Sequence, residues 1–339
     1  MKKKNQVTKL TAIILAMILA TISLAGCGTA AKSSSSANKA TTVNIALQPS
    51  STFAPFYVVR KNGWLEAALK DQGVTVNWTD FQSGPPMNES FAAGKQDIGV
   101  IGDVPAVSAI ANGQDNTFIA ALEGGAQYSL LVAKDSDIKS LSDLKGKKIG
   151  TVTGSTGQNL TEKLLASVNL DINKDVTMVN ISTGDAQTVL TDKEVDAVAI
   201  WEPNVTRLED NGTARELANG NTIGFLGVNV IFGRSDFVKN NPDIVKVVLE
   251  QYYRGAKALQ DDPQQYANQV KDVYSLDTAD QMIKTLDKNK QTLVFSDGDI
   301  AYLQDVVSFL KEIGSTDKDV TIKDHVDDAI AQQVVKENK

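Results

Sequence analysis

Short apolar runs alternate with amphipathic stretches along most of the chain. The runs are rich in β-favourable residues and end in polar or glycine-containing turns. They lie at residues 43–47, 74–78, 97–101, 117–122, 128–133, 149–152, 176–181 and 195–200. Helical patterns follow many of these strands, so the chain predicts an α/β fold.

The helical stretches repeat apolar residues at three- and four-residue intervals. The first is expected over residues 54–69, weakened or interrupted at Gly63 because glycine disfavours helix. Further helices are expected at 87–93 after a Pro-Pro turn, at 104–111 and at 184–190. The C-terminal part is mostly helical, with a face of Ile244, Val247, Val248 and Tyr252, a second face of Leu303, Val306, Val307 and Leu310, and a last helix at 326–335.

Residues 147–160 form the stretch with the clearest chemical meaning. The strand at 149–152 breaks into a turn that contains Gly154, Ser155 and Thr156, and a helix follows it. Free N-H groups at a helix start suit an oxyanion without a positive side chain. The stretch therefore predicts an anion seat, although Gly-Ser-Thr turns also join strands to helices in α/β proteins that bind no anion there.

Two other strand ends carry candidate site residues. Asp103 follows the strand at 97–101, and the carboxyl ends of strands are where open α/β sheets bind ligands. Asp103 also suits a helix N-cap, and the two roles can coexist. Trp201, Glu202 and Pro203 follow the strand at 195–200 and suit a cleft wall, with core packing as the alternative for Trp201.

The chain is long enough for two lobes. Some 300 residues remain after the N-terminal segment is set aside, which exceeds the usual size of a single core. The apolar stretch 223–232 mirrors 128–133, and we interpret both as crossovers between lobes. The expected boundaries are 42–127 with 233–339 for lobe 1, and 128–232, which includes the hinge crossovers, for lobe 2.

The N-terminus has the pattern of a targeting segment. Four lysines precede the apolar run from Leu10 to Leu24, which is short for a membrane span. The sequence Leu24-Ala25-Gly26-Cys27 resembles the lipobox of bacterial lipoproteins, which predicts a signal peptide at 1–26 and lipidation of Cys27. The alternative is a general secretory signal with a chance cysteine. Residues 27–41 are small and polar, as in a flexible tether.

Charge excludes one class of function. The chain has 34 basic and 41 acidic residues, and residues 1–26 hold four of the lysines and no acid, so the remainder carries about −11. An acidic protein of this kind does not bind nucleic acid. Cys27 is the only cysteine, so internal disulfides are excluded and stability must come from the core.

Several motifs together resemble a known family. They are Phe81-Gln82-Ser83-Gly84-Pro85, Asp97-Ile98-Gly99, Gly102-Asp103, Leu141-Ser142-Asp143-Leu144-Lys145-Gly146, Gly154-Ser155-Thr156, Val195-Asp196-Ala197 and Trp201-Glu202-Pro203. In order and spacing, from about Val43 to Phe232, they resemble the substrate-binding proteins of ABC importers for alkanesulfonates, taurine and nitrate. The resemblance implies a type II periplasmic-binding-protein fold, in which two α/β lobes joined by two crossovers hold a ligand between them.

The resemblance also implies a function and a site. The expected protein is an extracytoplasmic solute-binding protein that captures a small sulfonate and delivers it to an ABC permease and its ATPase, as a monomer without cofactor or metal. The expected ligand-binding residues are Gln48, Ser51, Gln82, Gly102, Asp103, Glu123, Gly154, Ser155, Thr156, Trp201 and Glu202. Asp103, Glu123 and Glu202 are candidates to receive an amine if the ligand is taurine-like.

One residue departs from the family pattern and leaves the ligand open. Glu202 stands where alkanesulfonate binders often carry Asp. Nitrate, a pyrimidine precursor of thiamine or another small anion are the alternative ligands, and a ligand-sensing lipoprotein without a transporter is the alternative role. Enzymes that make pyrimidine precursors share the implied fold but rely on histidine and a cysteine cluster. This chain has His325 in its polar tail and Cys27 at the anchor, so we expect no enzyme activity.

Overall fold

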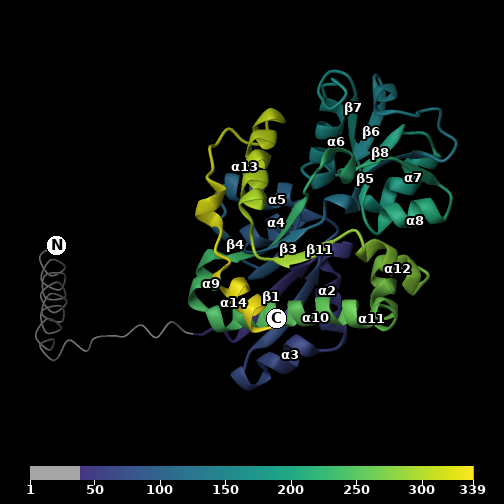
Figure 1. The fold of residues 1–339 in the computed structure, drawn as a ribbon. Helices are drawn as coiled ribbons and strands as arrows, with labels where there is room; N and C mark the ends of the chain where they lie inside the picture. Colours follow the sequence, from purple (N-terminus) through teal and green to yellow (C-terminus); the bar gives the residue numbers. More distant parts are fainter. Residues whose placement is uncertain (1–38, 339) are drawn as a thin grey trace, which may run out of the picture. The chain divides into compact units, whose positions relative to one another are not determined.

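Two β-sheets organise the computed structural model, which describes residues 39–338 apart from the side chains of residues 290 and 291 (Figure 1). The predicted signal peptide, Cys27 and most of the predicted tether lie outside these residues. The last tether residues contact the body of the protein, since Ala40 N-H donates to Asn241 Oδ1 at 2.9 Å. No helix in residues 39–338 is long and apolar enough to cross a membrane.

The first sheet has six strands in the order β11-β4-β10-β3-β1-β2. β1 runs parallel to β2 and β3, whereas β10 is antiparallel to β3 and β4, and β11 is antiparallel to β4. We call this sheet, with the helices that pack on it, the first lobe. Its strands are β1 (Thr42–Leu47), β2 (Thr75–Asp80), β3 (Ile98–Ile101), β4 (Asn116–Glu123), β10 (Val228–Arg234) and β11 (Lys290–Leu293).

The helices of the first lobe cover both faces of its sheet. Most of them match a predicted helix, and Gly63 divides the first one as expected, at φ +62°. They are α2 (Ala54–Lys61), α3 (Trp64–Leu69), α4 (Gly84–Ala92), α5 (Asp103–Ala111), α9 (Ser235–Asn240), α10 (Pro242–Asp261), α11 (Pro263–Val270), α12 (Ala279–Leu286), α13 (Asp297–Glu312) and α14 (Ala329–Glu337).

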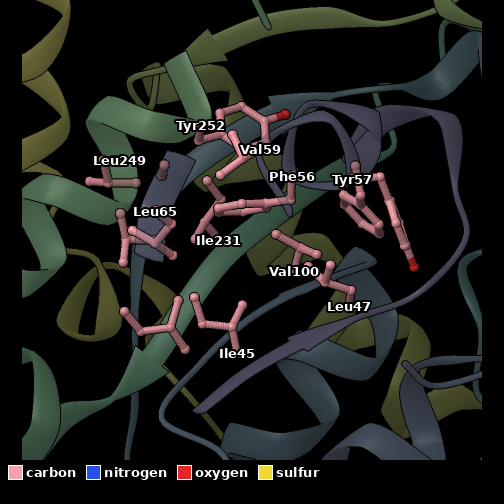
Figure 2. Packing of buried hydrophobic residues seen from close by; sticks show 14 of the residues in the cluster. Ile45, Leu47, Phe56, Tyr57, Val59, Leu65, Val100, Ile231, Leu249 and Tyr252 are labelled. Carbon is pink, nitrogen blue, oxygen red and sulfur yellow. The ribbon is translucent and has the colours of Figure 1, made fainter. Parts of the chain in front are cut away.

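The apolar pattern of the chain explains which helix covers which face. Successive residues of a strand point to opposite sides, so Ile45 packs toward α2 and α10 while its neighbour Ala46 packs toward α4, α5 and α13. Figure 2 shows the larger of these two cores, where Phe56 of α2 lies among Val59, Ile231 and Tyr252. Phe56 is fully buried. The two cores fix the sheet, and with it the positions of the loops at the strand ends.

The second sheet has five strands in the order β7-β6-β8-β5-β9, and with its helices we call it the second lobe. Leucines on one face of α6 pack on one side of this sheet, and α7 and α8 pack on the other. The elements are β5 (Tyr128–Ala133), β6 (Lys148–Thr151), α6 (Thr156–Ala166), β7 (Thr177–Asn180), α7 (Ala186–Thr191), β8 (Ala197–Trp201), α8 (Asn204–Asp210) and β9 (Ala214–Asn219).

The crossovers begin before the two stretches that the sequence predicts for them. The chain passes between the sheets through residues 124–127 and 220–227, which contain the short 3₁₀ turns η3 (Gly125–Gln127) and η6 (Gly220–Ile223). The interpretation of 128–133 as a crossover is wrong, since these residues form β5 of the second sheet. The crossover expected at 223–232 is partly wrong, since residues 228–232 belong to β10 in the first sheet. The strand cannot begin earlier because Gly224 and Gly227 both have positive φ.

Candidate functional site

The start of α6 carries the predicted anion seat. β6 ends at Thr151, and Gly154 turns the chain at φ +73° before Ser155 caps the helix. Ser155 Oγ accepts from Gln158 N-H at 3.4 Å, and Gln158 Oε1 accepts in return from Gly154 N-H at 2.8 Å. Ser155 N-H donates to Val152 O at 3.2 Å. The turn is therefore held in place by its own hydrogen bonds.

The next two amides of the seat have no such partner. Within the part of the chain that the structure describes, no acceptor takes a hydrogen bond from Thr156 N-H or Gly157 N-H. Gly157 also allows the helix to approach the sheet, since a Cβ there would lie 2.9 Å from Thr151 Oγ1. Two free N-H donors at a helix start, where the helix dipole is positive, are suited to donate hydrogen bonds to an anion.

Asp103 of the first lobe lies directly against this seat. It is fully buried at the start of α5, and its Oδ1 accepts from Val104 N-H at 2.6 Å and from Thr156 Oγ1 at 2.5 Å. The Tyr302 hydroxyl of α13 donates to Oδ2. Burial raises the pKa of Asp103, while the hydrogen bonds from Thr156, Tyr302 and Val104 oppose that shift. The two predicted turns are thus brought together, one from each lobe.

Two strands that follow the crossovers complete this side of the site. Tyr128 of β5 donates from its hydroxyl to Asn229 Oδ1 of β10 at 2.7 Å. Burial raises the pKa of Tyr128, so its hydroxyl keeps its proton. The Tyr128 ring lies 6.3 Å from the Trp201 ring, centroid to centroid. Trp201 is almost completely buried and belongs to the core of the second lobe. It therefore packs in the core, which was the alternative to a place in the cleft wall.

Glu202 is fully buried between the lobes. Its Oε2 accepts from Thr206 N-H at 3.0 Å, and its Oε1 accepts from Thr206 Oγ1 at 3.0 Å. Lys288 of the first lobe places its Nζ 2.5 Å from the same Oε1. Both carboxylate oxygens of Glu202 are therefore engaged by the protein itself.

A polar cluster of the first lobe adjoins Glu202. Glu202 N-H donates to Gln127 O at 3.0 Å, and Gln127 Oε1 accepts from Ser50 Oγ at 2.8 Å and from Ser51 Oγ at 3.3 Å. Asn289 Nδ2 donates to Ser51 Oγ at 2.9 Å. Gln127 Nε2 and Gln48 Oε1 are buried and find no partner among residues 39–338.

The remaining predicted residues lie farther out. Gln82 is exposed and lines a groove of about 660 Å³ between the lobes, together with Pro85, Val152 and Thr153. Pro85 of the first lobe lies next to the seat turn, since a Cβ at Gly154 would be 4.0 Å from Pro85 Cγ. Glu123 is half-buried at the end of β4.

Positive charge is placed away from the seat, as the sequence indicates. Each of the five arginines has its own contact elsewhere: Arg60 pairs with Asp80, Arg234 pairs with Asp97, Arg207 donates to Asn204, Arg215 donates to backbone carbonyls and Arg254 lies over the Trp64 ring. Lys163 of α6 pairs with Asp305 across the lobes at 2.6 Å.

In residues 39–338 no group of three histidine, aspartate or glutamate side chains could hold a metal ion.

Sequence reasoning missed several residues of this arrangement. Tyr128, Asn229, Gln127, Lys288 and Tyr302 were not among the expected site residues. Gln127 and Tyr128 stand at a crossover between lobes, which is a usable signal because ligands bind where lobes meet. Lys288 and Tyr302 carry no local signal, since their partners are 86 and 199 residues away in sequence.

Comparison with known proteins decides the family. The model of the NMT1/THI5-like family matches residues 50–266, which is more than half of the chain. The chain belongs to the NMT1/THI5-like family. Over 328 residues it is 28% identical to a Bacillus subtilis (strain 168) protein named as an aliphatic sulfonates-binding protein, covering 96% of this chain and 97% of the relative.

A second relative by sequence and a solved structure are also similar to this NMT1/THI5-like protein. An Escherichia coli (strain K12) protein of the same name is 30% identical over 174 residues, or 51% of this chain and 54% of the relative. The alkanesulfonate-binding protein SsuA from Xanthomonas axonopodis pv. citri, solved bound to MOPS, superposes with a TM-score of 0.78 at 24% identity, covering 86% of this chain and 99% of that one. The likeness confirms the type II periplasmic-binding-protein fold expected from the sequence, and the relatives by sequence are binding proteins.

Proposed function

We propose that this protein is the extracytoplasmic solute-binding component of an ABC importer and captures a small sulfonate between its two lobes. The observation that carries the proposal is the pair of amides at Thr156 and Gly157, which have no partner in residues 39–338. They belong to the turn whose Thr156 hydroxyl contacts Asp103 of the first lobe. A sulfonate is ionised at every physiological pH, so it needs fixed donors and no titrating partner. The relatives named above support the same ligand class.

The remaining expectations form part of the proposal. We take the predicted domains as the two lobes, with the boundary at β10, and we expect the ligand to touch the predicted site residues. A lipid at Cys27 holds the monomeric protein outside the membrane, where it delivers the ligand to a permease and its ATPase. We propose no enzymatic role, and His325 supports this because its Nδ1 lies 3.3 Å from Asn116 O, remote from the seat.

A matched pair of variants tests the amide donor. Proline is tolerated at the first position of a helix and Ser155 is already extended, at φ −105° and ψ 165°, so Thr156→Pro fits the fold and removes the N-H. Thr156→Ala loses the same hydroxyl but keeps the N-H. A hydrogen bond to a charged group contributes about 1.5–3 kcal/mol, so Thr156→Pro is expected to bind about 10-fold to 150-fold more weakly than Thr156→Ala.

The measurement is titration calorimetry on the full chain in non-ionic detergent. The panel comprises alkanesulfonates, taurine, nitrate and thiamine pyrimidine precursors. Tightest binding of a sulfonate, with the two variants differing as stated, supports the proposal. Tightest binding of nitrate or a precursor, or equal affinities of the two folded variants, contradicts it.

A further inference from the structure

The carboxylate of Glu202 already holds a cation. It is fully buried, and an ionised carboxylate removed from water needs donors and an opposite charge. Thr206 supplies two of the donors, and Lys288 supplies the charge at 2.5 Å. Glu202 is therefore neutralised before any ligand arrives.

Lys288 is held in position by its neighbours. Asn289 Nδ2 donates to Ser51 Oγ at 2.9 Å and to Thr285 O at 3.0 Å, and its Oδ1 accepts from Thr52 Oγ1 at 2.6 Å. The loop that carries Lys288 is thus tied to the loop after β1. The Lys288 side chain is mostly buried, with 22% of its surface exposed, so the charge stays near Glu202.

Asp103, the buried acid beside the seat, is also occupied. Asp103 accepts from Val104 N-H, from Thr156 and from Tyr302. The groove beside the seat includes the apolar side chains of Val152, Val179 and Ile181, and the acids Asp185 and Glu194 also line it. Neither Glu202 nor Asp103 therefore offers an unoccupied carboxylate to a ligand ammonium.

We propose that Lys288 is a specificity-determining residue that makes the protein select sulfonates with an uncharged tail over ω-aminosulfonates such as taurine. This inference rests on the proposed function. A ligand ammonium would have to displace Lys288 from Glu202 or lie beside a like charge, and such repulsion is an effective means of discrimination. An uncharged tail meets neither obstacle.

Ethanesulfonate and taurine make a sharp test, because they differ by one ammonium group. Binding of both is measured by titration calorimetry on the full chain in non-ionic detergent. The variants are Lys288→Gln, the double variant Glu202→Gln/Lys288→Gln, and Lys284→Gln. The last is the matched control, since Lys284 also bridges to the second lobe, through Asp210 at 3.2 Å, but is about half exposed.

We expect the wild type and Lys284→Gln to bind ethanesulfonate at least about tenfold more tightly than taurine. Lys288→Gln leaves the Glu202 carboxylate without its lysine partner. The ratio of ethanesulfonate affinity to taurine affinity then shifts toward taurine by about tenfold or more. The double variant lacks both charges and binds the two ligands about equally. It also replaces the single variant if an unpaired Glu202 prevents folding.

Four results overturn the inference. Wild-type protein that binds taurine as tightly as ethanesulfonate excludes the selection. An unchanged ratio in folded Lys288→Gln, or in the double variant, shows that Lys288 does not set it. An equal loss of affinity for both ligands in Lys288→Gln identifies Lys288 as an anion contact instead. If the wild type binds no sulfonate at all, the proposed function fails, and the inference fails with it.

Discussion

A methyl group added at Gly102 tests whether the lobes meet as the structure shows. Gly102 has φ −69°, so alanine fits its backbone. Its Cβ would lie 2.5 Å from Thr156 Oγ1, whereas Asn229 Oδ1 and Tyr128 OH are at an ordinary 3.6 Å. Thr156 Oγ1 cannot turn away without losing its hydrogen bond to Asp103. The strain therefore falls on the contact between lobes and not on the fold of either.

The expected cost follows from overpacking. Adding a methylene-sized group to a packed site costs about 1–3 kcal/mol. If the ligand-bound form needs the lobes in contact, Gly102→Ala raises the dissociation constant about 5-fold to 150-fold. Thermal unfolding of the variant changes little, because separated lobes relieve the contact.

Calorimetry and small-angle scattering measure affinity and lobe separation on the same samples. Thr156→Ala removes the atom that clashes, so Gly102→Ala costs less in that background, and the double-mutant cycle is non-additive. Gly184→Ala is the control, since the nearest atom to its Cβ is Ser182 Oγ at 3.6 Å. Unchanged affinity in Gly102→Ala, or strict additivity with Thr156→Ala, would refute the reasoning.

Two further predictions concern stability. Burial raises the pKa of Asp103 above its unfolded value, so the stability that this group contributes is present below about pH 4 and is lost as pH rises through the folded pKa. Urea unfolding at several pH values should show wild-type stability falling relative to Asp103→Asn over that range, and a flat difference would show that burial does not dominate. Phe56→Ala should lower the free energy of unfolding by about 3–5 kcal/mol, because Phe56 is fully buried beside Val59 and Tyr252 (Figure 2). If the free energy of unfolding falls by less than about 1 kcal/mol, the neighbouring side chains have moved to fill the cavity left by the Phe56 ring.

Much of the fold follows from local patterns. The strand-turn-helix at 147–160 and the break at Gly63 were predictable because alternation, helical spacing and glycine conformation act within a few residues. β9 and β11 were not predicted. Three of the four residues of β11 are polar, and β9 is largely half-buried, so neither forms a clear apolar run.

The candidate site was predictable only where it lies at strand ends. Asp103 and Ser155 follow buried strands, so their positions could be expected from the sheet. Their partners could not. Tyr302 lies beside the apolar face of α13 that Leu303 marks, and nothing local in its sequence indicates that its hydroxyl reaches Asp103. The bond joins residues 199 apart and exists only once the chain has folded.

The position of β10 has a consequence for the order of assembly. β10 inserts between β3 and β4, so the first sheet stays divided until residues 228–234 have left the ribosome. The second sheet is contiguous and has all its strands once Asn219 has emerged. We expect residues 128–219 to gain protected amides before β1 and β3 do, which pulse-labelled hydrogen exchange on ribosome-bound nascent chains would reveal. The half of the molecule that begins first along the chain is thus the half that finishes last.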